Sequence, residues 1–242
     1  MSNQPLNTLH LRRYTAAQFA LGRWRFNLRV HRRRLAWRVV GMGARLAKRT
    51  LDVVGSLAFL IAFSPLFALI ALLVKLEDGG PVLFAQERIG RLGRTFNMLK
   101  FRSMCLGAEE RLRELLARNH HKEGVTFKLK DDPRITKVGR WLRRFSLDEL
   151  PQFLNVLRGD MSLVGPRPPV PREVALYSLA DRRRLAAKPG LTCIWQVSGR
   201  SSIDFSRQVE LDVQYIERQN FRLDLELLAK TVPAVLSGKG AC

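Results

Sequence analysis

The sequence predicts a predominantly α-helical, membrane-associated protein with a small β-hairpin element, and three observations support this fold class. Residues 53–74 form a run of 22 positions without a charged side chain. Basic residues lie on both sides of that run. The 242-residue chain as a whole has 42 Lys and Arg against 21 acids. Beyond it, apolar residues recur at helical spacing between turn signals. The 46% hydrophobic content excludes a wholly disordered chain.

The chain begins with a basic N-terminal extension, which we place at residues 1–47. Up to Leu51 there are twelve basic residues and no acidic one, whereas the remaining 191 positions carry a net charge of only +9. Apolar residues interleave with the arginines, as in a helix that lies on an anionic bilayer; they are Trp24, Leu28, Leu35, Trp37, Val39 and Val40. A disordered basic arm is the alternative interpretation.

The next segment, residues 48–75, is predicted to enter the membrane, because about 20 apolar residues suffice to span a bilayer. Ser64 and Pro65 lie at its centre. Proline removes a backbone donor and breaks the helix, and Ser64 could satisfy a freed carbonyl by bonding back to its own turn. Both flanks are basic, and the positive-inside rule places both in the cytoplasm. From these residues alone, a kinked span and a re-entrant hairpin both remain open.

A β-hairpin is predicted after this segment. The apolar runs 82–85 and 96–99 are separated by a stretch that contains Gly90 and Gly93. Farther along, Asp132-Pro133 predicts a turn, and Val138, Leu142 and Phe145 predict a short helix.

The segment 146–159 predicts an amphipathic helix from Glu149 to Arg158 that ends at Gly159. Ser146-Leu147-Asp148-Glu149 has capping-box spacing, and Pro151 is tolerated only near a first turn. Either Ser146 or Asp148 is therefore expected to be the N-cap. On this tetrad alone, the two acids need do no more than cap a helix.

Two adjacent carboxylates also suggest catalysis. Two acids that cleave a glycosidic bond must flank that bond, about 5 to 9 Å apart. Neighbours on one helix diverge by about a third of a turn, so the geometry argues against glycosidic cleavage. Asp148 is expected at the positive end of the helix, and an aspartate held ionised there, beside arginines and a divalent ion, is better suited to attack an electrophilic phosphorus. Arg143 precedes Asp148 by five residues, and the stiff turn Gly165–Pro168 would fix the Arg167 guanidinium for phosphate contact. Taken singly, each of these residues could equally be structural.

Taken together, the motifs resemble those of the bacterial sugar transferases, the monotopic polyprenol-phosphate phosphoglycosyl transferases. The resemblance covers about four fifths of the chain, from about Lys48 to the C-terminus. The motifs are, in chain order, Lys48-Arg49, Ser64-Pro65, Lys100-Phe101-Arg102-Ser103-Met104, Asp132-Pro133-Arg134-Ile135-Thr136, Ser146-Leu147-Asp148-Glu149-Leu150-Pro151-Gln152, Gly159-Asp160-Met161-Ser162, Val164-Gly165-Pro166-Arg167-Pro168, Pro189-Gly190-Leu191-Thr192, Trp195-Gln196 and Ser198-Gly199-Arg200.

The resemblance implies a monotopic membrane protein at the cytoplasmic face of the bacterial inner membrane. It favours the re-entrant helix-break-helix, with the break at Ser64 and Pro65, together with amphipathic interfacial helices. Residues 76–242 would then form the catalytic domain at the cytoplasmic face.

The resemblance also implies a reaction. In the family, the aspartate that matches Asp148 is the nucleophile, the residue that matches Glu149 supports it, and Mg2+ binds at the aspartate. Asp148 would attack the β-phosphate of a UDP-sugar, release UMP and hold the phosphosugar until polyprenol phosphate (undecaprenyl phosphate) takes it. This would be the first membrane step of exopolysaccharide, capsule, O-antigen or glycoconjugate synthesis, with downstream glycosyltransferases as further partners.

The same resemblance assigns supporting residues. The catalytic set gains Arg143 and Lys100, and the substrate-binding set is Arg167, Arg200, Arg102 and Pro166.

Two departures from the family stand out: Cys193 replaces a usual glycine, and the basic extension is additional. A nucleic-acid-binding protein, suggested by the pI near 11.2, would explain only the extension, so no nucleic-acid partner is expected. A non-catalytic, membrane-anchored partner in polysaccharide assembly would not need the intact pair Asp148 and Glu149.

Overall fold

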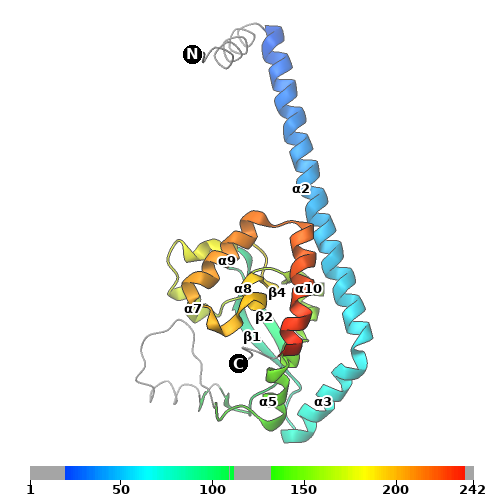
Figure 1. Ribbon diagram of the computed structural model, residues 1–242, viewed down its shortest axis with the longest axis vertical. Coiled ribbons are helices and arrows are strands. Elements are labelled where there is room, and N and C mark those ends of the chain that lie inside the picture. The colour runs from blue at the N-terminus through cyan, green and yellow to red at the C-terminus, as the bar shows by residue number, and fades with distance from the viewer. Residues whose placement is uncertain (1–19, 109, 112–131, 238–242) are drawn as a thin grey trace. The chain divides into compact units, whose positions relative to one another are not determined.

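The computed structural model describes residues 20–108, 110–111 and 132–237. It is mostly helical and contains a small antiparallel β-hairpin, as predicted (Figure 1). The chain divides into two units, residues 1–48 and 49–242, and each is described by itself.

A sharp bend interrupts the apolar segment. Helix α2 (Ala20–Ala62) ends just before α3 (Ser64–Asp78), and the segment Gly41–Ala62 meets α3 at a bend of 64° (Figure 1). The Ser64 hydroxyl donates to the Ile61 carbonyl at 2.9 Å, as expected from the sequence. Within the part of the chain that the structure describes, no single helix is long and apolar enough to cross a membrane, whereas Gly41–Ala62 and Ser64–Asp78 meet that requirement as a bent pair.

Buried polar contacts tie the last part of α2 to the body of the protein. Asp52 accepts hydrogen bonds from the Ser162 hydroxyl and the Leu163 backbone N–H, both at 2.9 Å. Arg49 donates at 2.7 Å to two carbonyl oxygens in the last turn of α6 (Gln152–Arg158). Cations are favoured at this end of a helix, where carbonyls lack intrahelical partners.

The predicted hairpin is confirmed: β1 (Leu83–Ile89) pairs antiparallel with β2 (Thr95–Phe101). The side chain of Asn155 joins the hairpin to α6. Its amide oxygen accepts from the Leu99 N–H at 2.9 Å and its amide nitrogen donates to the Asn97 carbonyl at 2.8 Å. Asn155 is fully buried, so this pairing satisfies an amide that would otherwise be costly to bury.

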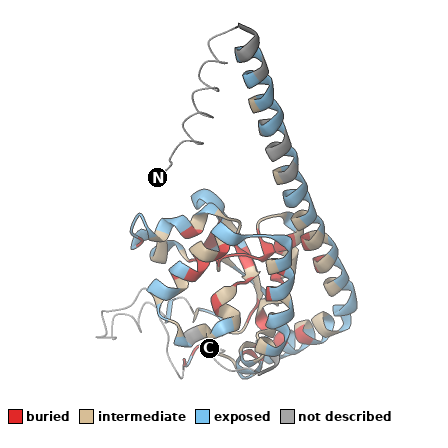
Figure 2. Cartoon of the chain, turned by 45° about the horizontal axis from the view of Figure 1, so that its top comes forward, coloured by how far each residue is buried: buried red, intermediate tan, exposed pale blue. Residues whose placement is uncertain are grey.

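One face of α3 packs against protein. Ile70 and Val74 are buried with Phe101 and with Leu142, which lies on α5 (Lys137–Arg144). Figure 2 shows buried residues gathered where the helices meet the strands. The short helix and the turn at Asp132-Pro133 that were predicted from the sequence are both present.

The acidic tetrad does not begin a helix in the predicted way. Leu147–Glu149 form a separate 3-10 turn (η2), and α6 begins only at Gln152. The prediction of a capping Ser146 or Asp148 is wrong: neither side chain caps η2 or α6. Ser146 takes a left-handed backbone conformation (φ 56°), and Pro151, which has no N–H, separates the turn from the helix. The predicted stop at Gly159 is confirmed, with φ 94°.

A second, parallel pair of strands was not predicted. It joins β3 (Ser162–Val164) to β4 (Gly190–Thr192). A Cβ atom on Gly190 would lie 2.0 Å from the backbone nitrogen of Gly165, so the two segments approach this closely only because Gly190 lacks a side chain.

The remaining elements complete the body around a core that contains Met161, Val164 and Tyr215. These elements are η1 (Arg91–Gly93), α7 (Pro171–Ala175), η3 (Asp181–Ala186), α8 (Ile194–Ser198), η4 (Arg200–Ser202), α9 (Phe205–Arg218) and α10 (Phe221–Ser237). Tyr215 is fully buried, and its hydroxyl donates to Asp224 at 2.7 Å, which fixes α9 against α10.

Candidate active site

The acidic pair sits in a turn that neighbouring elements hold in place. Turn η2 packs against β2 and α5, and Leu147 and Leu150 on either side of the pair contact the core beneath α3. Asp148 is only 7% exposed. The left-handed backbone of Ser146 reverses the chain after α5, and a non-glycine residue in that conformation is often found where a functional side chain must be aimed.

Glu149 is neutralised by two cations from distant parts of the chain. The ammonium of Lys100, on β2, lies 3.1 Å from its carboxylate, and the Arg167 guanidinium lies 3.5 Å away. Burial alone would raise the pKa of Glu149, but Lys100 and Arg167 outweigh burial and hold that pKa well below its usual value. Glu149 is therefore ionised at neutral pH.

Asp148 has the opposite environment. Its carboxylate accepts no hydrogen bond and forms no ion pair with any of the residues described. The pKa of Asp148 is raised, mainly by burial and further by the adjacent negative charge of Glu149. The positive charges of Lys100 and Arg143 lower this pKa and so oppose part of the rise. An ionised carboxylate that lacks hydrogen bonds is poorly stabilised and is correspondingly ready to react with an electrophile.

Arg167 is held by a rigid turn, as the prolines predicted. The Pro166 carbonyl accepts from the Gly190 N–H at 2.9 Å, and the Pro168 carbonyl accepts from Arg88 at 2.9 Å. Arg88 is buried, and burial together with the nearby Arg167 lowers its pKa to about 10. Sequence reasoning missed Arg88 as a site residue, because it follows the apolar run 82–85 and was expected in the connection between the two strands, whereas β1 continues to Ile89.

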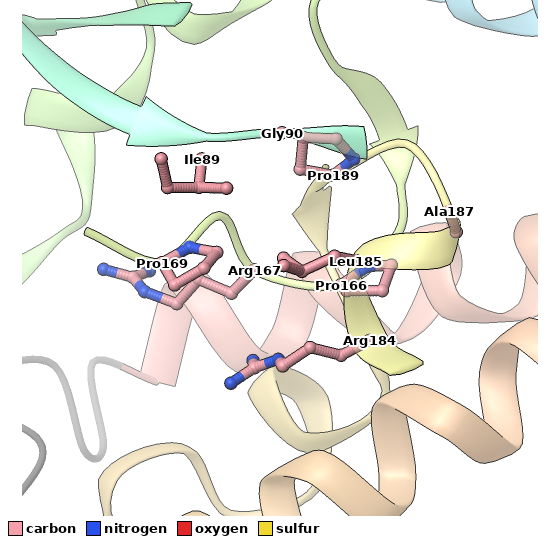
Figure 3. Close-up of a pocket in the computed structure, with 9 residues that line it drawn as sticks. All are labelled: Ile89, Gly90, Pro166, Arg167, Pro169, Arg184, Leu185, Ala187 and Pro189. Carbon is pink, nitrogen blue, oxygen red and sulfur yellow. The ribbon is translucent and has the colours of Figure 1, made fainter. Parts of the chain in front are cut away.

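A small pocket adjoins Arg167. Arg184 and Pro166 are among the other residues that line it, and Figure 3 shows these lining residues. Arg184 is committed to structure, because it pairs with the buried carboxylate of Asp212 at 2.5 Å and lies over the ring of Tyr177. Burial raises the pKa of Asp212 to about 6 even with this partner.

Two predicted substrate-binding residues have other surroundings. Arg102 pairs with Asp78 and donates to the Val74 carbonyl at 3.4 Å, which places it at the C-terminal end of α3. Arg200 begins η4 with a left-handed backbone (φ 51°). The predicted residues that the structure brings together are Lys100, Asp148, Glu149 and Arg167, with Arg143 close enough to affect the pKa of Asp148.

The site fits a magnesium ion only in a particular way. Across the described ranges, no group of three or more His, Cys, Asp or Glu side chains could hold a metal. Mg2+ is often held by one or two carboxylates together with substrate phosphates. Asp148, whose oxygens are unpaired among the described residues, suits that arrangement, whereas Glu149 is occupied by cations.

The family described as bacterial sugar transferase matches residues 43–238. The chain is 47% identical over 197 residues to a galactosyl transferase, CpsE, of Streptococcus agalactiae, covering 81% of this chain and 43% of the relative. It is 44% identical over 199 residues to the exopolysaccharide production protein ExoY of Sinorhizobium fredii, covering 81% and 88%. It is 46% identical over 201 residues to an undecaprenyl-phosphate galactose phosphotransferase of Salmonella typhimurium, covering 82% and 42%. The chain thus matches most of the length of some relatives and less than half of others.

Proposed function

The chain belongs to the bacterial sugar transferase family, and we propose that it transfers a phosphosugar from a UDP-sugar to polyprenol phosphate, such as undecaprenyl phosphate, in polysaccharide or glycoconjugate synthesis. The observation that carries this proposal is the contrast between two adjacent carboxylates. Glu149 is paired with Lys100 and Arg167, whereas Asp148 is buried and has no partner among the residues described.

In the first step, a carboxylate oxygen of Asp148 attacks the β-phosphorus of the UDP-sugar. The new bond joins this oxygen to phosphorus, and the bond from phosphorus to the bridging oxygen breaks. UMP leaves with that oxygen and its electron pair, and an aspartyl phosphosugar is formed. In the second step, an oxygen of polyprenol phosphate attacks the same phosphorus, which releases the Asp148 carboxylate and yields a polyprenyl diphosphosugar.

The cations of the site have two jobs in this scheme. Lys100 and Arg167 neutralise Glu149, and their positive charges also face a diphosphate that approaches Asp148. Arg143 keeps the pKa of Asp148 lower than burial alone would allow, which favours the ionised, nucleophilic form. The left-handed turn at Ser146 positions both carboxylates, and neither of them caps a helix.

Mg2+ would be held by Asp148 together with substrate phosphate oxygens, and when bound it would supply positive charge at the diphosphate. Lys100 and Arg167 would stay beside Glu149 and leave the Asp148 carboxylate to the metal ion.

The bent pair α2–α3 supports a monotopic arrangement at the cytoplasmic face of the inner membrane. Ile70 and Val74 pack on the body, while large apolar residues at i, i+3, i+4 and i+7 on α3 are exposed; they are Leu69, Leu72, Leu73 and Leu76. An apolar face of this kind suits contact with lipid. A helix pair that enters one leaflet and returns would bring the site to the depth of the phosphate of a polyprenol carrier.

The test is a panel of UDP-sugars incubated with the full chain, a short-chain polyprenol phosphate and Mg2+, with UMP release as the measurement. We expect one or a few sugars to give UMP and a polyprenyl diphosphosugar in equal amounts. Failure of every UDP-sugar while another nucleotide sugar is turned over would reject the UDP specificity. Sugar transfer without phosphate, with UDP as product, would reject the reaction class.

A further inference from the structure

The first part of α2, residues 20–48, carries a stripe of exposed apolar side chains. The side chains of Trp24, Leu28, Leu35, Val39, Met42 and Leu46 are between 44% and 66% exposed. They recur along a continuous helix, and Figure 2 shows exposed residues along this stretch.

The spacing of the stripe suits a flat surface. Trp24, Leu35 and Leu46 are separated by eleven residues each, as are Leu28 and Val39. Eleven residues make three turns at about 3.67 residues per turn, close to the 3.6 of a straight helix. The stripe therefore runs almost straight along one side. A left-handed coiled coil would need about 3.5 residues per turn instead.

The charge of this helix identifies the partner. Residues 20–48 contain nine basic residues and no acid. At about 100° per residue, Arg32 lies at one edge of the stripe and Arg45 at the other, while Arg33 lies on the far side. A second copy of the helix would bring like charges together at both edges, since it offers no acid to pair with them.

We propose that residues 20–48 form an interfacial helix that lies on the anionic phospholipid surface of the membrane, with the stripe facing the acyl chains and the flanking arginines contacting lipid phosphates. A basic helix with Trp and Leu along one side binds anionic bilayers through these two contributions. This inference is independent of the sugar transfer proposed above, because the helix lies outside the residues that form the candidate site.

The experiment measures the depth of single positions in the full-length protein. Cys105, Cys193 and Cys242 are replaced by alanine, and one cysteine with an environment-sensitive fluorophore is introduced as Leu35→Cys. Phe26→Cys is the matched control, because Phe26 is also exposed but lies on the opposite side of the helix. Both proteins are placed in lipid nanodiscs made of either phosphatidylglycerol or phosphatidylcholine.

In phosphatidylglycerol discs, the label at position 35 should shift to the blue and be quenched by a lipid-borne nitroxide, and the label at position 26 should behave as in water. The difference should shrink in phosphatidylcholine discs and at high salt. Equal exposure of both labels would overturn the proposal. Protection of position 35 that is the same in both lipids and in detergent, with label-to-label proximity between chains, would show a second copy as the partner and would also overturn it.

A second pair of variants guards against an effect of the label itself. In a protein labelled at Val39→Cys, the double substitution Leu28→Gln and Leu46→Gln should weaken quenching by the lipid nitroxide. Gln has a helix propensity similar to that of Leu and leaves the charge unchanged, so the variant loses only apolar surface. Phe26→Gln should leave the quenching unchanged. Equal loss in both variants would contradict a one-sided surface.

Discussion

The body of the protein and its N-terminal extension use positive charge in opposite ways. In residues 49–237, the deeply placed cations have fixed acceptors, as in the pairs Lys100–Glu149, Arg102–Asp78, Arg134–Asp132 and Arg184–Asp212. In residues 1–47, ten basic residues share the sequence with no acid at all. Cations that pair with acids organise a fold and a site, whereas a basic stretch whose sequence contains no acid suits an external anion.

The largest effect is expected in the body of the protein, at Asp148. Asp148→Asn should abolish turnover, because an amide cannot form the aspartyl phosphosugar. The fold should survive, since the Asp148 carboxylate accepts no hydrogen bond from the residues described. Activity is measured as UMP release, and thermal unfolding is the control for structure. Near-normal activity in this variant would remove Asp148 from the nucleophile role.

The next effect distinguishes a buried ion pair from an exposed one. Arg184→Met leaves Asp212 buried without its cation and should lower the free energy of unfolding by about 3–5 kcal/mol. The matched control is Arg183→Met, because Arg183 pairs with Glu217 at the surface, where a pair is worth about 0–1 kcal/mol. Denaturant unfolding of both variants measures the difference. Similar losses would mean that the buried pair does not stabilise the body as described.

A smaller effect concerns pH. The pKa of Asp148 is raised above its ordinary value, chiefly by burial, and Arg143 counteracts that rise. Removing the cation in Arg143→Met should raise the pKa further, so the acidic limb of the pH–rate profile should move to higher pH. Arg140→Met, an exposed position on the same helix α5, is the control and should not move the limb. A limb that moves to lower pH would show that Arg143 does not act on the ionisation of Asp148.

The smallest effect on catalysis is expected from the basic N-terminal extension. Removing residues 1–44 should leave turnover in detergent unchanged, because every motif that matches the family lies later in the chain. Binding to anionic vesicles should weaken, with a difference that shrinks as salt screens the arginines. Loss of activity in detergent by a folded truncated protein would show that the extension serves the site itself.

Local signals explain what the sequence could predict. The helix break at Phe63, just before Ser64-Pro65, the hairpin around Gly90 and the stop at Gly159 all follow from backbone chemistry that one or two residues decide. The Ser146 cap was predicted wrongly because its spacing is equally compatible with a left-handed turn, and only the packing of η2 on β2 and α5 selects that turn.

Non-local contacts explain the rest. The pairing of Glu149 with Lys100 spans 49 residues, and no periodicity encodes it. The resemblance grouped these residues, but it did not include Arg88, which a strand carries to the Pro168 carbonyl 80 residues away. Strands β3 and β4 have three residues each, too few for a repeating pattern to be read. Such contacts depend on the whole fold.

The most direct test of the central claim is incubation of the protein with its UDP-sugar and Mg2+ in the absence of polyprenol phosphate. A covalent mechanism predicts UMP in an amount comparable to the protein and, by intact mass and peptide mapping, one phosphosugar on the peptide that contains Asp148. UMP release that requires polyprenol phosphate, with no added mass on Asp148 after rapid quenching, would contradict the two-step account and favour direct transfer between the two substrates.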